Sequence, residues 1–310
     1  MKLKSISLIV LASVITAGCQ LMNEEQQSAP QNVSHNTLQG PYLGQKPPGD
    51  MAKPFAPNLI TTSHFEVTGV FSPEMNEFYY IRGDENNKKQ EFVVYIDHGS
   101  HWQETVISKR VGTPLFSPDG KTMHLGKRYM ERDGADWSEI KNLKSPVKDV
   151  PIMRLSASQK GTYFFDEFKK DFTGDIRYSR LINGKHETPK LLNKKINTGK
   201  SFHPFIAPDE SYLIFDSTRE GGYGDSDLYI SYRQADGTWG DPINLGDKIN
   251  SESWEAVASI TADGKYMFFN RRINHGSDGE LPNVDIYWVD AEFIDRLRPT
   301  SQTQNLARGE

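Results

Sequence analysis

One block of sequence decides the fold, and it reads His203-Pro204-Phe205-Ile206-Ala207-Pro208-Asp209, then Tyr212-Leu213-Ile214-Phe215, then Asp227-Leu228-Tyr229-Ile230. The same block returns as Ala258-Ser259-Ile260-Thr261-Ala262-Asp263, then Tyr266-Met267-Phe268-Phe269, then Asp285-Ile286-Tyr287-Trp288. Short apolar runs between Gly, Asp and Pro turns, repeated about every 40–55 residues, are typical of the blades of a β-propeller. The sequence therefore predicts an all-β fold of four-stranded antiparallel blades.

Three earlier copies of the block can be aligned by their tight turns. The aligned positions are Pro73, Pro118, Ser158, Pro208 and Ala262, at spacings of 45, 40, 50 and 54 residues. A run of aromatic and aliphatic residues follows each turn, as expected of a strand inside a blade. Four copies also carry a later Gly-containing turn, such as Asp133-Gly134, which predicts a hairpin between the third and fourth strands.

The two ends of the repeat predict how the ring closes. Pro57-Asn58-Leu59-Ile60 aligns with fourth strands such as Pro242-Ile243-Asn244-Leu245, whereas the last copy stops after its third strand, Asp285 to Val289. The N-terminal run can therefore supply the outer strand of the last blade and remove a free sheet edge. This count gives five blades. Six blades, one of them built from degenerate sequence, is the alternative.

The first residues of the chain have the composition of an export signal. Lys2 and Lys4 precede an apolar stretch from Ile6 to Ile15, and small residues follow before Cys19. An apolar run of about ten residues is too short to span a bilayer, so we expect a signal peptide over residues 1–18. Ordinary secretion with cleavage at another position is the alternative.

Cys19 is the only cysteine of the chain, and the small residues that end in Gly18-Cys19 resemble a bacterial lipobox. The resemblance implies that Cys19 is lipidated and becomes the mature N-terminus. In such lipoproteins an Asp after the cysteine favours the inner membrane, and this chain has Gln20. We therefore expect a chain anchored to the outer membrane, facing the periplasm or the cell surface.

The composition divides the rest of the chain. Residues 19–50 are rich in Gln, Asn, Ser and Pro, which predicts a flexible, lipid-anchored tether. Residues 51–297 then form the propeller, and residues 298–310 form a polar tail. The formal net charge is -5, which argues against nucleic acid as a partner.

The repeat resembles a known family at several positions. Phe116-Ser117-Pro118-Asp119-Gly120-Lys121 and Asn244-Leu245-Gly246-Asp247-Lys248-Ile249-Asn250 look like the WD-like propeller repeats of the TolB-like family of bacterial envelope proteins. The resemblance covers about residues 54–290 and implies a propeller, usually with six blades. It does not imply one function, because the family includes binding proteins and propeller modules of larger enzymes.

We expect function on the face of the propeller that carries the long loops. In this strand order the tight turns share one face, which we call the turn face. The links from the second to the third strand, and from the fourth strand to the next blade, share the other face, which we call the mouth. Arginine forks there can grip carboxylates or sulfates. The candidate ligand-binding residues are Arg82, Lys127, His203, Arg219 and Arg271.

Glu66 and Glu255 are the candidate catalytic residues. They occupy the same position of the repeat in blades one and five, which become neighbours when the ring closes. One interpretation is a carboxylate pair of the glycosidase type. The alternative is that these acids pair with the arginines and hold the blades together.

The sequence contains no recognisable cofactor motif. It lacks a nucleotide-binding loop, a zinc-type cluster of His and Cys, and a serine-elbow motif. The loop from Gly221 to Asp227 could hold calcium, although its carboxylate spacing lacks the EF-hand pattern. We expect no cofactor and no metal site, with calcium in this loop as the alternative.

Two classes of function are consistent with these features. The main prediction is a non-catalytic, envelope-anchored lipoprotein that binds a protein or a polar, anionic glycan at the mouth. The alternative is a carbohydrate-active hydrolase or lyase that uses carboxylates at the mouth.

We predict that Cys19 anchors the mature chain. Because stable anchoring needs more than one acyl chain, it depends on the several chains that lipoprotein processing adds to this cysteine. A Cys19→Ser variant should therefore move from the membrane fraction to the soluble fraction, as measured by immunoblotting of fractionated cells. Retention of the variant in the membrane fraction at the parent level would contradict the anchor.

Overall fold

The computed structural model describes residues 38–274 and 283–299, and the structural statements below refer to these residues. They belong to the second of two compact units into which the chain divides, Thr37–Glu310. The expected signal peptide, the lipidation site at Cys19 and most of the expected polar tail lie outside the described residues.

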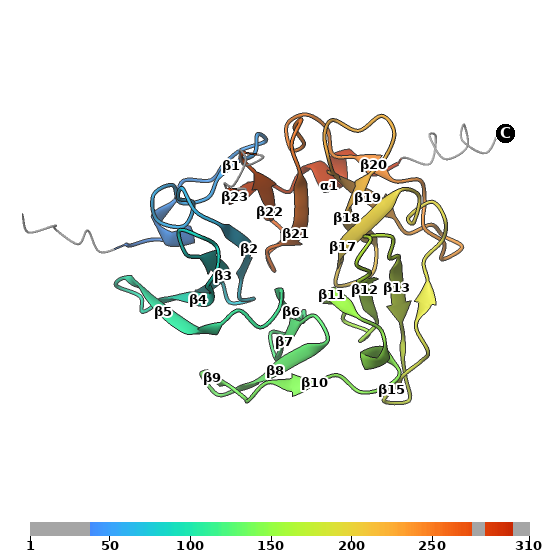
Figure 1. Cartoon of the computed structure of the whole chain (residues 1–310), viewed down its shortest axis with the longest axis horizontal. Helices are drawn as coiled ribbons and strands as arrows, with labels where there is room; N and C mark the ends of the chain where they lie inside the picture. Colours follow the sequence, from blue (N-terminus) through green and yellow to red (C-terminus); the bar gives the residue numbers. More distant parts are fainter. Residues whose placement is uncertain (1–37, 275–282, 300–310) are drawn as a thin grey trace, which may run out of the picture. The chain divides into compact units, whose positions relative to one another are not determined.

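Five antiparallel sheets form the blades of a five-bladed β-propeller (Figure 1). Blade 1 contains β2 (Glu66–Phe71), β3 (Glu77–Gly83), β4 (Gln90–Asp97) and β5 (Trp102–Lys109). Blade 2 contains β6 (Pro114–Phe116), β7 (Thr122–Leu125), β8 (Arg128–Asp133) and β10 (Lys141–Asn142), with β9 (Asp136–Trp137) paired to β8. Blade 3 contains β11 (Ile152–Ala157), β12 (Tyr163–Glu167), β13 (Ile176–Ser179) and β16 (Lys190–Leu191), with the hairpin β14 (Leu181–Ile182) and β15 (Lys185–His186).

The last two blades complete the ring. Blade 4 contains β17 (Lys200–Ile206), β18 (Tyr212–Thr218), β19 (Asp227–Tyr232) and β20 (Ile243–Asn244). Blade 5 contains β21 (Glu255–Ile260), β22 (Tyr266–Arg272), β23 (Val284–Asp290) and β1 (Lys53–Pro54). The short helices are η1 (Tyr42–Gly44), η2 (Val147–Asp149) and α1 (Phe293–Arg296). The prediction of five blades is confirmed, and the six-bladed alternative is wrong.

The tight turn between the first and second strands is built in the same way in more than one blade. In blade 2 the N–H of Gly120 donates to the carbonyl oxygen of Ser117 at 2.9 Å, and the Ser117 hydroxyl donates to Asp119 at 2.6 Å. Gly120 has a φ of 69°, a left-handed conformation that glycine adopts without a steric penalty. In blade 5 the Thr261 hydroxyl donates to Asp263 in the same way, at 2.6 Å. The turn residues of the repeat therefore fix the first hairpin of these blades.

The ring closes through a strand from the N-terminal part of the chain. Strand β1 pairs antiparallel with β23, with Lys53 opposite Trp288 and Pro54 opposite Tyr287. The N–H of Phe55 then donates to the carbonyl oxygen of Ile286 at 2.8 Å. Closure by an N-terminal fourth strand is therefore confirmed.

The closing strand lies earlier in the sequence than expected. The run from Pro57 to Ile60, predicted to be this strand, lies in a turn in which the N–H of Asn58 donates to the carbonyl oxygen of Thr61 at 2.9 Å. Ala56 and Asn58 have φ values of 46° and 63°, which take the chain out of the extended conformation that a strand needs. The prediction of the strand position was wrong by a few residues.

Phe55 anchors the closing strand in an aromatic cluster between blades 1 and 5. Its side chain is 0% exposed. Its ring centroid lies 4.8 Å from that of Phe78, 4.9 Å from that of Phe268 and 5.1 Å from that of Trp288. Aromatic pairs at these separations contribute beyond the area that they bury.

Residues 38–50 also pack on this part of the propeller, although the sequence predicted a tether as far as Asp50. Leu43 is 0% exposed, and the ring of Tyr42 lies 5.0 Å from that of Tyr266. The indole Nε1 of Trp102 donates to the carbonyl oxygen of Gly40 at 2.8 Å. The propeller domain therefore includes residues 38–50, because the apolar side chain of Leu43 is buried in its core.

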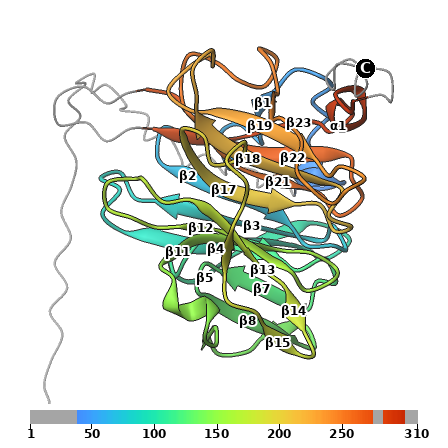
Figure 2. The ribbon, with the colours of Figure 1, turned by 90° about the vertical axis from the view of Figure 1, so that its right-hand side faces the viewer.

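The inner strands β2, β6, β11, β17 and β21 contact their neighbours around the axis. Figure 2 shows the blades from the side, with long loops at one edge and α1 toward the opposite edge. None of the helices in the described ranges has the length and apolar character needed to cross a bilayer.

We predict that Phe55→Ala destabilises the propeller by about 3–5 kcal/mol, because the truncation leaves a cavity between blades 1 and 5. Chemical denaturation monitored by circular dichroism measures the change. Phe168→Ala, at a side chain that is 40% exposed, is the control and should change stability by about 0.5 kcal/mol or less. Equal effects of the two substitutions would show that β1 does not depend on this anchor.

Candidate functional site

A hydrogen bond of one kind joins neighbouring blades beside the axis. An oxygen of an Asp or Asn near the end of a second strand accepts a backbone N–H from the inner strand of the following blade. The pairs are Asp166 with His203 at 3.1 Å, Asp216 with Val257 at 3.2 Å and Asn270 with Thr68 at 2.9 Å. We call these contacts the inter-blade bonds. The third pair crosses the seam between blade 5 and blade 1, so the same contact holds the closed ring.

Each donor of an inter-blade bond lies in a β-bulge with left-handed backbone. The φ values are 48° at His203, 62° at Val257 and 68° at Thr68, and the strand register shifts at each position. Such backbone costs on the order of 1–3 kcal/mol for a residue other than glycine. The strained residues are the ones whose N–H groups donate to the neighbouring blade. The left-handed backbone therefore accompanies each inter-blade bond.

His203 lies between two buried carboxylates. Asp166 and Asp216 are both 0% exposed. Nδ1 of His203 lies 3.0 Å from Asp216, and Nε2 lies 3.9 Å from Asp166. Burial alone would lower the pKa of His203, but the charge and hydrogen bond of Asp216, together with the charge of Asp166, raise this pKa on balance. The site therefore favours the protonated imidazole, in which Nδ1–H donates to Asp216 and the charge also faces Asp166.

Arg154 is the second cation at this position. Its side chain is 0% exposed, and its three guanidinium nitrogens find no hydrogen-bond acceptor among the described residues. Burial lowers the pKa of Arg154 to about 10, against the opposing charges of Asp216 and Asp166, so the group stays protonated at neutral pH. We call Arg154, Asp166, His203 and Asp216 the axial cluster. Its two acids and two bases balance in charge, as in a buried structural ion network.

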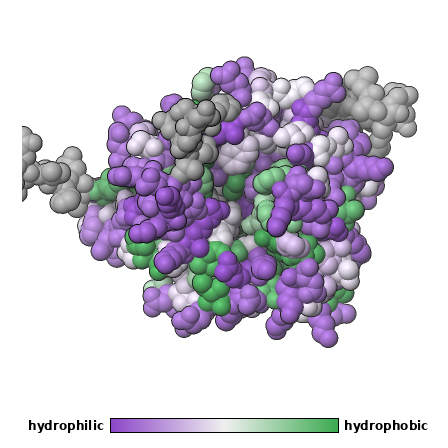
Figure 3. Space-filling model, in the orientation of Figure 1, coloured by the Kyte–Doolittle hydropathy of each residue, from purple (hydrophilic) through white to green (hydrophobic). Residues whose placement is uncertain are grey.

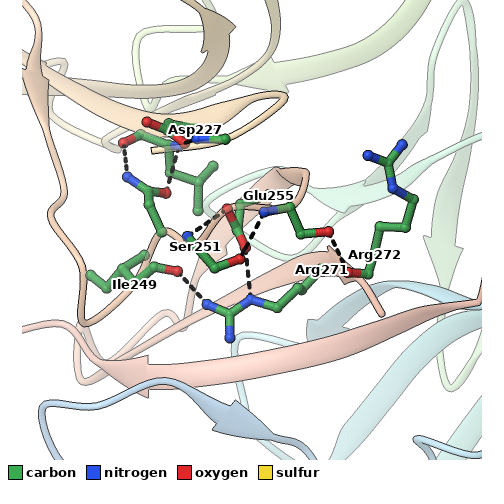
Figure 4. A network of polar contacts seen from close by, with 10 residues as sticks. Asp227, Ile249, Ser251, Glu255, Arg271 and Arg272 are labelled. Carbon is green, nitrogen blue, oxygen red and sulfur yellow. Dashed lines mark hydrogen bonds and ion pairs between the residues drawn. The ribbon is translucent and has the colours of Figure 1, made fainter. Parts of the chain in front are cut away.

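Glu66 and Glu255 occupy equivalent positions, and each is bonded to the loop that leads into its own inner strand. Glu66 accepts the N–H and hydroxyl of Thr62 at 3.1 Å and 2.6 Å. Glu255 accepts the N–H and hydroxyl of Ser251 at 3.0 Å and 2.5 Å, and Nε of Arg271 at 2.7 Å (Figure 4). Both acids therefore fix the loops at the mouth.

Arg219 and Arg271 direct their guanidinium groups into the protein. Nη2 of Arg271 donates to the carbonyl oxygen of Ile249 at 2.6 Å, and its Cζ lies 4.4 Å from the ring centroid of Tyr287. Arg219 makes the corresponding bond to the carbonyl oxygen of Ile196. Ligand binding by these arginines stays a prediction, and several of their donors are already engaged.

The remaining candidates lie elsewhere on the propeller. Arg82 forms ion pairs with Glu91 and Glu104 of its own blade, both at 3.0 Å. Lys127 is exposed between β7 and β8 of blade 2. The structure therefore does not gather the five predicted ligand-binding residues into one constellation, and only His203 joins the axial cluster.

The loop from Gly221 to Asp227 is closed by its own carboxylate. Asp227 accepts the N–H of Tyr223 at 2.7 Å and of Gly224 at 3.2 Å, and the amide of Asn244 at 2.7 Å. In the part of the chain that the structure describes, no group of three or more His, Cys, Asp or Glu could hold a metal ion. The loop has the construction of a capped turn.

Glu66 and Asp285 form a carboxyl pair that the sequence analysis did not identify. Phe65 and Val284 form a parallel bridge, so the residues that follow them are neighbours. Burial and the charge of Glu66 raise the pKa of Asp285 to about 7, and burial raises the pKa of Glu66 against the bonds from Thr62. Carboxyl groups whose pKa values are raised by burial and a nearby acid also occur at acid–base sites.

Large apolar side chains are exposed on the loops of the mouth. The exposed fractions are 40% for Phe168, 52% for Phe172, 50% for Tyr223 and 45% for Ile273. All four lie between the second and third strands of blades 3, 4 and 5. We call these residues the mouth patch. In Figure 3, hydrophobic side chains gather around the centre of the face shown, beside a hollow.

The residues of the inter-blade bonds carried a signal in the sequence. Asp166, Asp216 and Asn270 each follow a phenylalanine directly at the end of an apolar run, as in Phe215-Asp216. Arg154 had no comparable signal, because no other copy has an arginine in its bulge.

No protein-family model matches the chain, and no curated protein matches it. Similar solved structures include TolB from Acinetobacter baumannii, with a TM-score of 0.44 and 14% identity over 74% of this chain and 57% of that chain. They also include a putative TolB from Agrobacterium tumefaciens, with a TM-score of 0.42 and 15% identity over 74% of this chain and 78% of that chain. An exo-beta-1,3-galactanase from Clostridium thermocellum has a TM-score of 0.46 and 10% identity over 75% of this chain and 62% of that chain.

These likenesses concern the fold. The chain spans little more than half of the first TolB structure. TolB propellers are among the similar structures, as the resemblance of the repeats led us to expect. A binding protein or an enzyme on such a fold is distinguished only by its site.

We predict that protonated His203 stabilises the folded chain. Its pKa is raised above the unfolded value of about 6.5, so the stabilisation is full below pH 6.5 and is lost as pH rises through the folded pKa. The difference in unfolding free energy between the parent and His203→Asn, measured in urea titrations, should therefore shrink as pH rises above about 6.5. A difference that stays constant with pH would contradict the protonated assignment.

Proposed function

We propose that the chain is a non-catalytic, lipid-anchored envelope propeller that binds a polypeptide through the mouth patch. The observation that carries this proposal is the exposure of Phe168, Phe172, Tyr223 and Ile273 on the loops of one face. Contiguous exposed apolar groups mark interaction surfaces, and within the mouth patch the rings of Phe168 and Phe172 are in contact. Aromatic side chains are also enriched at protein interfaces.

The aromatic side chains of blade 3 extend toward the axis. The ring of Phe172 lies 6.4 Å from that of Phe168 and 6.3 Å from that of Phe202. The ring of Phe202 lies 6.0 Å from the imidazole of His203, which is 17% exposed at its side chain. A partner that covers this row of rings would therefore gain apolar contact and reach one polar group near the axis.

The state of the charged groups favours a polypeptide over an anionic glycan. Arg219 and Arg271 donate to backbone carbonyl oxygens of the loops, so binding a sulfate or carboxylate would compete with existing bonds. A partner that binds the apolar side chains of the mouth patch does not have to break existing hydrogen bonds. The envelope location rests on the lipobox-like residues before Cys19, and the net charge of -5 gives no support to a nucleic acid partner.

Photo-crosslinking in cells tests the proposal. A photoreactive phenylalanine analogue at position 172 should form a specific crosslink to a protein, whereas the same analogue at position 182, on the hairpin of blade 3, should not. Ile182 is a suitable control because it is 47% exposed, close to the 52% of Phe172. Phe172→Ser should then weaken binding of the purified partner about tenfold or more, since burial of a Phe side chain is worth about 1.5–3 kcal/mol. Ile182→Ser should leave the affinity unchanged.

A carbohydrate-active hydrolase is the second candidate, favoured by the adjacent carboxyl groups of Glu66 and Asp285. In that case the parent would release sugars from oligosaccharides, and Asp285→Asn would abolish the release. Such a result, or equal affinities of Phe172→Ser and Ile182→Ser for the partner, would contradict the non-catalytic proposal.

A further inference from the structure

The turn face holds a pocket at the propeller axis, at the opposite end from the mouth. Its volume is about 190 Å³, and residues of all five blades line it. It lies where the inner strands end and the tight turns begin, since Pro73, Pro118, Pro208 and Ala262 contribute to its lining. We call it the axial pocket. It is separate from the mouth patch, which is built from the loops between second and third strands.

Apolar side chains and polar groups contribute to the walls of the axial pocket in comparable measure, and the serine and threonine hydroxyls among them are already bonded. Phe71, Phe116 and Ile260 are among the lining residues. The hydroxyl of Ser156 accepts the N–H of Ile206 at 3.0 Å, and the hydroxyl of Ser259 donates to the carbonyl oxygen of Gly69 at 3.1 Å. The hydroxyls of Ser117 and Thr261 donate to the aspartates of their own turns. The walls therefore suit an apolar group better than a sugar or a hydrated ion.

The size of the axial pocket suits one side chain. Pockets for drug-sized ligands usually enclose about 300–1,000 Å³. A cavity of about 150 Å³ is sufficient to bind benzene. At about 190 Å³ the axial pocket can take a single phenylalanine, leucine or similar group.

The rim of the axial pocket is acidic. Four of the five turns carry an acid next to the lining residue, and these acids are Glu74, Asp119, Asp209 and Asp263. The Ser117 hydroxyl lowers the pKa of Asp119. Burial opposes ionisation of Asp209 and Asp263, but hydrogen bonds from Ser211 and Thr261 leave both pKa values lowered.

Lysines offset part of this charge. The turns also contain Lys121, Lys160 and Lys265, and Glu210 is a further acid that lies within 3.6 Å of the Lys160 ammonium group. Arg233 also lies 3.9 Å from Glu210. Five carboxyl groups therefore stand against three lysines and this arginine, which leaves the rim with one negative charge in excess. Complementary charge increases the rate and specificity with which a cationic partner docks.

We propose that the axial pocket binds an apolar side chain, of the size of phenylalanine or leucine, carried by a polypeptide with lysine or arginine beside it. The walls take the apolar group, and the acidic rim takes the neighbouring cations. This is a second binding site, and it does not depend on the function proposed for the mouth.

The rim is held in place before any ligand binds. The N–H of Gln159 in the blade 3 turn donates to the carbonyl oxygen of Pro208 in the blade 4 turn at 2.8 Å. Between blades 1 and 2, a Cβ added to Gly120 would lie 3.1 Å from the ring of Pro73, so these turns are also in close contact. A preformed rim lowers the entropy that binding must overcome.

Fluorine NMR with short peptides tests the axial pocket on the purified full chain. The probe is a tripeptide in which 4-fluorophenylalanine lies between two lysines, and its partner peptide has two glutamates instead. The lysine peptide should bind at least about fivefold tighter. A lysine peptide with alanine at the centre, monitored by its competition with the fluorinated probe, should not bind. Glu74→Gln removes one acid from the rim. It should therefore reduce the difference in affinity between the lysine peptide and the glutamate peptide.

Matched variants locate the binding. Ala262→Trp, at an exposed position of the rim, should weaken binding of the lysine peptide at least about tenfold. Ala235→Trp, at an exposed turn farther from the axis, and Phe172→Ser, in the mouth patch, should leave it unchanged. A melting temperature equal to that of the parent confirms that each variant is folded.

Several results would overturn the proposal. One is the absence of binding by the lysine peptide, and another is unchanged binding by Ala262→Trp. Equal binding of the lysine and glutamate peptides would remove the role of the rim. Binding of free 4-fluorotoluene as tightly as the lysine peptide would assign the pocket to a small apolar ligand instead.

Discussion

The rest of the structure depends on the inter-blade bonds beside the axis. Backbone hydrogen bonds of the sheets hold each blade together, but crossing from one blade to the next requires other bonds, some of them between turns, as from Gln159 to Pro208. Asp166, Asp216 and Asn270 make that crossing, each with an N–H that only a left-handed bulge presents. A hydrogen bond to a carboxylate contributes about 1.5–3 kcal/mol, and one to a neutral amide oxygen such as that of Asn270 about 0.5–1.5 kcal/mol. Both are comparable with the backbone strain of the donor. The strain of Val257 and Thr68 is therefore tolerable only while their acceptors are in place.

Polar groups near the mouth already form hydrogen bonds within the protein, with which a ligand would have to compete. Glu255 holds Ser251 and Arg271, and Asp227 holds the loop before β19, so groups that look free in the sequence already have partners (Figure 4). The exposed apolar loops and the axial pocket are different, because the described contacts leave them open. The two proposed binding sites therefore depend mainly on apolar surface, one at each end of the axis. Charged groups contribute to specificity in second place.

The sequence predicted local features well and long-range choices poorly. Turns such as Ser117 to Gly120 and runs such as Phe78-Tyr79-Tyr80 depend on neighbours in the chain, so repetition was sufficient to place them. The closing strand was displaced because two residues, Lys53 and Pro54, carry too little pattern to be distinguished from the run that begins at Pro57. The acceptor of an arginine is also a tertiary choice. Arg219 bonds a carbonyl oxygen that lies more than twenty residues away, and no spacing rule could identify it.

Closure by β1 has a consequence for the order of events during synthesis. The closing strand is made well before its partner β23, the last strand of the propeller. The cluster around Phe55 therefore lacks Phe268 and Trp288 until blade 5 is made. At about 5–20 residues per second, this interval lasts tens of seconds. During that time blade 1 displays the apolar face that blade 5 will cover, which exposes the nascent chain to aggregation. Circularly permuting the chain, so that β1 follows β23 directly, would turn this long-range contact into a local hairpin.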